Sequence, residues 1–127
     1  MVRSIFVVAA AGAFLVISAG TGRADGDPEK GKRAFNKCKT CHELTAEKNK
    51  IGPHMVGLFG RKAGSVAEFK YSPQMQGSNV VWDEKTIDAY IADPKKFIPG
   101  NKMVLAPIKD AAERADIIAY LKQQQKN

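Results

Sequence analysis

The stretch Cys38-Lys39-Thr40-Cys41-His42 decides how this chain of 127 residues folds. It contains both cysteines of the chain, and a histidine directly follows the second one. The pattern Cys-x-x-Cys-His is the attachment signature of a covalently bound haem. On a helical turn, two thiols three positions apart can reach one edge of a porphyrin, while the adjoining imidazole projects toward the iron. The motif therefore predicts one covalent haem c, attached through Cys38 and Cys41.

Three other interpretations of the two cysteines remain open. A disulfide is possible in an oxidising compartment, but a two-residue loop gives the smallest entropic gain and leaves His42 unexplained. A thioredoxin-like redox pair would need a βαβ context, which the surrounding helix-like segments do not offer. A structural zinc ion needs four ligands, and the only other histidine is His54. We expect His54 to be a surface or loop residue.

The N-terminus has the order of a secretory signal. Arg3 precedes an apolar run over residues 5–17, and small and polar residues follow up to Ala24. We expect a signal peptide over residues 1–24, cleaved after Ala24. An uncleaved membrane anchor is the alternative, but the run is well short of the ~20 residues needed to cross a bilayer. Cleavage would leave residues 25–127 as one periplasmic domain without stable membrane insertion.

The charge of that domain indicates an acidic partner. Arg3 and Arg23 would leave with the signal, so 18 Lys and Arg would remain against 13 Asp and Glu, a net charge of +5. Such a domain is attracted to acidic surfaces. We do not expect it to bind nucleic acid, because its lysines alternate with acidic residues, no nucleic-acid motif is present and the signal points away from the cytoplasm.

Helices are predicted at both ends of the domain. Asp27-Pro28 can form the N-cap and first residue of a helix that runs through Phe35 toward the cysteines. Gly31 inside this helix predicts that another backbone comes close. Residues 110–113 have capping-box spacing and begin a second helix. Its apolar face contains Ala115, Ile117, Ile118, Tyr120 and Leu121. We expect these two helices to cross.

A third helix is predicted between them. Asp83 can cap it, Ile87, Tyr90 and Ile91 recur at helical spacing, and Pro94 ends it. Residues 44–81 and 95–108 are rich in Gly, Pro, Lys and Ser and are expected to be mostly loops. No alternating strand pattern is visible. The fold class is therefore all-α, with three main helices, short ones and long loops that need something to wrap around.

A haem that carries electrons needs a second axial ligand, and a methionine thioether raises its potential. Met55 follows His42 so closely that packing on the same side of the ring is the more plausible role. Met75 lies in a polar stretch expected to lack a rigid frame. Met103 follows a Pro99-Gly100 turn that could fix its approach. The local sequence leaves ligation by Met103 and simple core filling equally open.

Several unrelated segments, in the right order, resemble the class I cytochromes c, in particular bacterial cytochrome c2 and the mitochondrial cytochromes c. They are Gly26–Lys32, the haem motif, Gly52-Pro53 with Gly57–Lys62, Trp82, Pro94–Gly100 with Lys102-Met103, and Ile118–Lys122. The resemblance covers nearly all of residues 26–124 and implies the small cytochrome c fold around one haem. The chain departs from the mitochondrial pattern at Met75, Asn101 and Leu105.

The resemblance also implies roles for individual residues. His42 and Met103 would be the axial ligands, and the Pro53 carbonyl would orient His42. The residues implied near the haem propionate are Arg61, Tyr71 and Trp82, and those implied near the methionine are Tyr90 and Asn101. Without the resemblance, the preferred interpretation is an ordinary core aromatic for Trp82 and Tyr90 and a solvated charge for Arg61.

The function implied is that of a periplasmic single-haem carrier, not an enzyme. It would move one electron from a quinol:cytochrome c oxidoreductase to a terminal oxidase or a photosynthetic reaction centre. A weak peroxidase or gas-binding haem protein is the alternative if Met103 is not a ligand, and a dedicated haem subunit of one dehydrogenase is another. We expect a monomer that docks on acidic surfaces of membrane redox complexes through Lys37, Lys95, Lys96 and Lys102.

Overall fold

The computed structural model describes Gly12 and residues 25–125, so nearly all of the expected signal peptide over residues 1–24 lies outside the described residues. The helices, in chain order, are α1 (Pro28–Ala34), α2 (Asn36–Lys39), α3 (Pro73–Gln76), α4 (Glu84–Ala92), α5 (Pro94–Phe97) and α6 (Ala111–Gln124). The described part of the chain contains no strand, only an isolated bridge between Lys62 and Val81. The predicted all-α class is thus confirmed.

The three main helices begin at the predicted caps. The Asp27 carboxylate accepts the Glu29 N–H at 2.9 Å, and Asp83 and Thr86 cap each other's backbone in a capping box. The Asp110 carboxylate accepts the Ala112 N–H at 2.9 Å. Each carboxylate also lies at the positive end of a helix dipole. The predicted capping box at α6 is not formed, because the Glu113 side chain pairs with Lys37 of α2 instead of reaching its own helix N-terminus.

Two short helices lie in segments that were expected to be loops. Pro73 and Pro94 occupy the first helical position of α3 and α5, where a missing N–H costs nothing. The Ser72 hydroxyl caps α3 at the Met75 N–H, and the Asp93 carboxylate caps α5 at the Lys96 N–H. The prediction that Met75 lacks a rigid frame is therefore wrong. Residues 40–72 and 98–110 form no helix or strand and contain only turns, bends and one partner of the single bridge.

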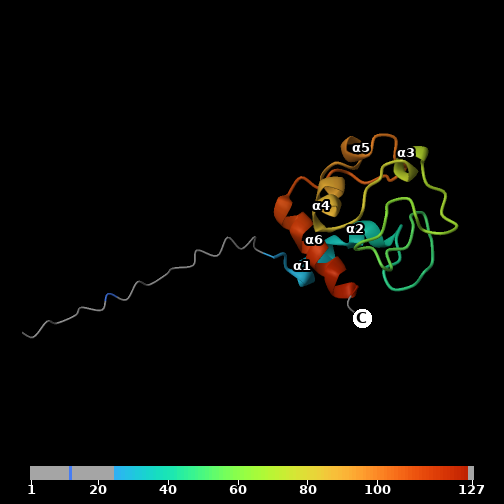
Figure 1. The fold of residues 1–127 in the computed structure, drawn as a ribbon. Helices are drawn as coiled ribbons and strands as arrows, with labels where there is room; N and C mark the ends of the chain where they lie inside the picture. Colours follow the sequence, from blue (N-terminus) through green and yellow to red (C-terminus); the bar gives the residue numbers. More distant parts are fainter. Residues whose placement is uncertain (1–11, 13–24, 126–127) are drawn as a thin grey trace, which may run out of the picture.

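The first and last helices cross, as predicted, and this crossing holds the two ends of the domain together (Figure 1). Gly31 of α1 lies directly on the α6 backbone, where a Cβ would collide with the Asp116 carbonyl. The Asp116 carboxylate accepts the Asp27 N–H at 2.7 Å. The rings of Phe35 and Tyr120 pack with their centroids 5.6 Å apart. Figure 1 shows α1, α4 and α6 on one side of the molecule and the loop of residues 40–72 on the other.

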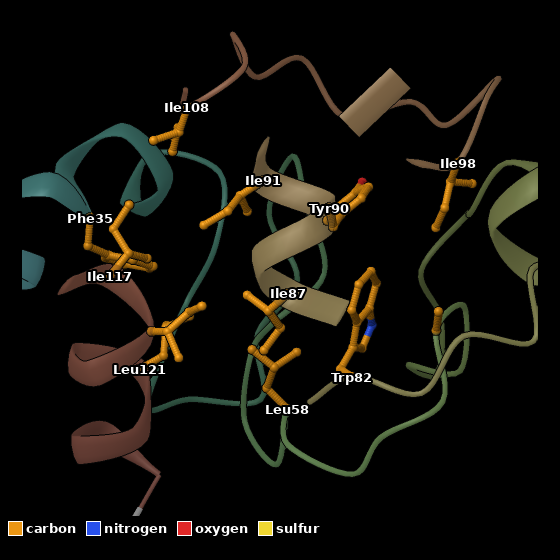
Figure 2. Packing of buried hydrophobic residues seen from close by; sticks show 12 residues of the cluster. Phe35, Leu58, Trp82, Ile87, Tyr90, Ile91, Ile98, Ile108, Ile117 and Leu121 are labelled. Atoms are coloured by element: carbon orange, nitrogen blue, oxygen red, sulfur yellow. The ribbon is translucent and has the colours of Figure 1, made fainter. Parts of the chain in front are cut away.

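The core draws on all parts of the domain. Ile87 and Ile91 of α4 point toward α6, while Tyr90 points away from it, toward Trp82 and Ile98 (Figure 2). The Trp82 and Tyr90 rings are 5.0 Å apart. The buried members of the cluster are Phe35, Leu58, Ala63, Trp82, Ile87, Tyr90, Ile91, Ile98, Ile108, Ile117, Ile118 and Leu121. None of the described helices is long and apolar enough to span a membrane.

The crossing gives a prediction about Gly31. Glycine to alanine inside a helix ordinarily stabilises it by about 0.5–1 kcal/mol, because the helix interior disfavours glycine. Here the added methyl group would push α1 off the Asp116 carbonyl, so we expect Gly31→Ala to destabilise the domain by about 1–3 kcal/mol. Denaturant unfolding of the haem-loaded protein measures this. Lys32→Ala, at an exposed position of α1, is the control and should change stability little. A Gly31→Ala variant as stable as the wild type would show that the helices do not approach so closely.

Candidate haem site

The haem motif begins in α2 and ends in the turn that follows it. Cys38 lies in α2, and its carbonyl accepts the N–H groups of both Cys41 and His42 at 3.0 Å. These bonds continue the helical path through the motif, so the three side chains are fixed relative to one another. Both cysteines are free thiols, and no disulfide joins them.

The motif borders a cavity of about 220 Å³. A water molecule takes up ~30 Å³ in the liquid, and protein interiors hold few voids larger than that, so this space is no packing defect. Much of the buried core faces it. The core side chains that line it are Phe35, Leu58, Trp82, Ile87, Tyr90, Ile91, Ile117 and Leu121.

His42 is held in one orientation at the wall of this cavity. Its Nδ1 lies 2.6 Å from the carbonyl oxygen of Pro53. Because a carbonyl can only accept, Nδ1 must carry the proton, which leaves the lone pair of Nε2 for a metal. Gly52 makes this approach possible, because a Cβ there would collide with the imidazole.

The surroundings of His42 also keep it neutral. Burial lowers the pKa of His42 below its ordinary value, and the charges of Arg61 and Lys50 lower it further, against the opposing effect of the bond to Pro53. A neutral imidazole is the form that binds a metal. The wall of the cavity thus presents a histidine in the state that iron requires.

The cysteines do not fit a zinc site. Burial raises the pKa of Cys38 to about 11, although the charge of Lys37 works against this. A structural zinc ion needs four ligands close together. Within residues 25–125 no three His, Cys, Asp or Glu side chains come together to hold a metal ion. Attachment of a haem is the chemistry that uses both thiols and His42.

All three methionines of the domain line the cavity: Met55, Met75 and Met103. Their placement alone does not single out one of them. Met75 is carried by α3, and Met55 lies in the segment that follows Pro53. Met103 is fixed through its backbone, because its N–H donates to the Asn101 side-chain oxygen at 2.9 Å.

Asn101 reaches the site only indirectly. It is buried but does not line the cavity, and its amide nitrogen donates to the carbonyls of Pro94 and Ile98 at 2.7 and 2.8 Å. Its side-chain oxygen accepts both the Met103 N–H and, at 3.2 Å, the Tyr90 hydroxyl. Tyr90 itself lines the cavity, and burial raises its pKa far above the ordinary value. Asn101 therefore connects α4 and α5 to the segment that carries Met103.

Arg61, Tyr71 and Trp82, which the resemblance implied near the haem propionate, all line the cavity. A short antiparallel pairing positions two of them, since the Trp82 N–H donates to the Arg61 carbonyl at 2.9 Å. The Arg61 guanidinium donates to the Val56 carbonyl at 3.0 Å and is half-buried, so it is not a freely solvated charge. Burial lowers the pKa of Arg61 and raises that of Tyr71. These donors suit a carboxylate such as a haem propionate.

The four lysines expected at the haem edge are not equivalent. Lys37 and Lys102 line the cavity, whereas Lys95 and Lys96 are exposed on α5 and do not. The Lys37 ammonium pairs with Glu113, and the Lys102 ammonium donates to the Lys70 carbonyl at 3.2 Å. His54, expected to be a loop histidine, lies partly buried in a loop outside the lining, with its Nδ1 accepting the Val56 N–H at 3.2 Å.

Sequence reasoning missed several residues at the mouth of the cavity. Ile51 and Val104 line it although their side chains are 77% and 96% exposed. Phe69 also lines it, as does Leu105, which the sequence had already singled out as a departure from the mitochondrial pattern. The sequence offered one signal for Ile51 and Val104, namely that each is next to a residue assigned to the site: Ile51 precedes Gly52-Pro53, and Val104 follows Met103. Apolar residues that remain this exposed beside a site mark its accessible edge.

The residues present thus fit a covalently attached haem. Two free thiols and a neutral, oriented imidazole lie on one wall of a mainly apolar cavity. Aromatic side chains suit the faces of a porphyrin, and polar donors near Arg61 suit its carboxylates.

Known proteins share both the sequence and the fold. The family model described as cytochrome c matches residues 28–125. Cytochrome c2 iso-2 of Magnetospirillum fulvum is 53% identical over 89 residues, 70% of this chain and 93% of that protein. Cytochrome c2 of Rhodomicrobium vannielii is 44% identical over 118 residues, 92% and 94% of the two chains. The structure of cytochrome cH from Methylobacterium extorquens superposes with a TM-score of 0.73 at 42% identity, covering 77% of this chain and 99% of that one.

These matches, taken with the geometry of the motif, assign one haem c attached through Cys38 and Cys41. The coarse activity follows from the same matches, since cytochrome c2 relatives support a single-haem carrier of electrons. The chain therefore belongs to the cytochrome c family, and within it resembles the cytochromes c2.

Proposed function

We propose that this cytochrome is a diffusible periplasmic shuttle, not an enzyme, that takes one electron from a quinol:cytochrome c oxidoreductase and delivers it to a terminal oxidase or a photosynthetic reaction centre. One observation carries the proposal: the oriented His42 and the backbone-fixed Met103 line the same cavity. If both side chains ligate the iron, no coordination position is left for a substrate.

Each residue then has a defined task. Cys38 and Cys41 would hold the haem as thioethers, and His42 and Met103 would bind its iron. The Pro53 carbonyl fixes the His42 ring and increases its electron donation. When bound, the haem supplies a one-electron iron couple, and the protein sets its potential through ligation, burial and charge.

The second group of residues shields the site. Arg61, Tyr71 and Trp82 would neutralise and cover the haem carboxylate. Tyr90 packs against Trp82 and is tied to Asn101, so it would limit movement near Met103. Exclusion of water from around the iron would keep the solvent reorganisation energy of electron transfer small, which suits an electron carrier.

Docking would take place around the accessible edge, where Ile51 and Val104 are exposed. Lys37, Lys95, Lys96 and Lys102 would orient this edge toward acidic surfaces of membrane redox complexes. Attraction of this kind increases the association rate more than the final affinity, as a shuttle that must leave its partner requires.

The first prediction concerns the ligands. The purified ferric wild-type protein should show a six-coordinate, low-spin spectrum with a sulfur-to-iron charge-transfer band. Met103→Ala should remove this band, lower the potential and admit exogenous ligands. Met55→Leu and Met75→Leu are matched controls, because both side chains line the same cavity, and they should retain the band. A high-spin wild-type spectrum would favour an enzyme or gas sensor instead. Persistence of the band in Met103→Ala would overturn the assignment of this ligand.

The second prediction concerns docking. Stopped-flow reaction with the native partner should slow steeply as salt rises, because the Debye length falls from ~30 Å at 0.01 M to ~10 Å at 0.1 M. Lys95→Glu and Lys96→Glu should slow the reaction at low salt and flatten this dependence. Lys32→Glu, with the same change in net charge on exposed α1, should have much less effect. Equal effects of the three substitutions would mean that only net charge matters.

The third prediction concerns export. Intact mass and N-terminal sequencing of the protein from the periplasmic fraction should show a start at or within a few residues of Asp25 and one haem that survives denaturation. Replacement of both Cys38 and Cys41 by Ser should abolish covalent haem. A full-length chain retained in the membrane fraction would favour the uncleaved anchor.

A further inference from the structure

Gln125, at the C-terminal end of α6, joins this helix to the segment of residues 52–58. Its side-chain oxygen accepts the Leu58 N–H at 3.2 Å, and its side-chain nitrogen donates to the Met55 carbonyl at 3.0 Å. Its own backbone N–H donates to the Leu121 carbonyl at 3.2 Å, which fixes it as the cap of the helix. An amide that uses both its donor and its acceptor on one short segment fixes the position and the orientation of that segment.

The same segment is bonded on its other side to the haem motif. The Gly52 N–H donates to the Cys41 carbonyl at 2.8 Å, and the Met55 N–H donates to the Glu43 carbonyl at 2.7 Å. Between these bonds, the Pro53 carbonyl accepts the His42 Nδ1–H. Residues 52–58 therefore lie between the haem motif and the end of α6.

This segment forms no helix or strand, so it is held by a few backbone bonds and by side-chain bonds. Arg61 and His54 both bond to Val56 within the same loop region. Gln125 provides the bonds that come from α6, across 67 and 70 residues of sequence. Leu58 and Leu121 belong to the same buried core cluster (Figure 2).

We propose that Gln125 is a positioning residue for the haem: by holding Met55 and Leu58 against the end of α6, it keeps the Pro53 carbonyl within reach of His42. The inference rests on the proposed function in one respect, namely that His42 ligates the iron. A carbonyl that accepts the Nδ1–H makes the imidazole a stronger donor and favours the ferric state. Loss of the Gln125 contacts should loosen that bond and raise the potential.

The test uses the haem-loaded, full-length protein with Gln125→Met, which keeps the length and apolar bulk of the side chain but removes both hydrogen bonds. The Leu58 N–H would then keep only its backbone bond to the Met55 carbonyl, at 3.2 Å, so its native-state exchange should become about tenfold faster. The midpoint potential should rise, and the resonance of the His42 Nδ1 proton in the reduced protein should shift. Gln125→Ala should behave in the same way, and serves if the first variant folds poorly.

Gln123→Met is the matched control, because Gln123 is an exposed residue of the same helix and makes no side-chain hydrogen bond within residues 25–125. It should leave all three measurements unchanged. Faster exchange of Leu58 without a change in potential or in the His42 resonance would reduce Gln125 to a structural residue and overturn the proposal. Unchanged exchange would also overturn it. Failure of the proposed function is recognised separately, by a wild-type ferric spectrum without low-spin, six-coordinate iron.

Discussion

Apolar side chains of α4, α6 and the haem-motif region face a shared cavity, and the rest of the structure depends on how this space is covered. A domain of about a hundred residues buries only about 60–65% of its unfolded surface, so it has little apolar material to spare. Here Phe35, Ile87, Ile117 and Leu121 belong to one buried cluster and also line the cavity. A covalently attached haem then becomes the largest apolar part of the core, and the long loops acquire something to enclose.

The two side chains proposed to bind the iron are carried by segments without helix or strand, so other bonds must fix their positions. His42 is fixed by the Pro53 carbonyl, and Met103 is fixed by Asn101. Both contacts lie in segments that are held by side-chain hydrogen bonds and turns. Asn101 bonds one segment to Pro94 of α5, and Gln125, at the end of α6, bonds the other at Met55. The rigidity of the site therefore depends on the crossing of α1 and α6 and on the short helices around it.

Some lysines of the domain form ion pairs with acidic side chains, and others do not. Lys37, Lys50 and Lys122 pair with Glu113, Glu43 and Glu84, and such surface pairs contribute little to stability. Lys95 and Lys96 take part in no ion pair within residues 25–125 and are exposed on α5. Their charge is thus available to a partner, whereas that of Lys37 is partly neutralised within the domain.

The sequence by itself determined the features that depend on neighbouring residues: the haem motif, the caps at Asp27, Asp83 and Asp110, and the all-α class. It also contained the Ser72-Pro73 and Asp93-Pro94 signals of α3 and α5, which were interpreted only as loop residues or as a helix end. Only the tertiary structure decided that three methionines line one cavity, that Asn101 acts through the backbone of Met103, and that Gln125 reaches Leu58. Caps and motifs are local, whereas these contacts join residues that come together only after the chain has folded.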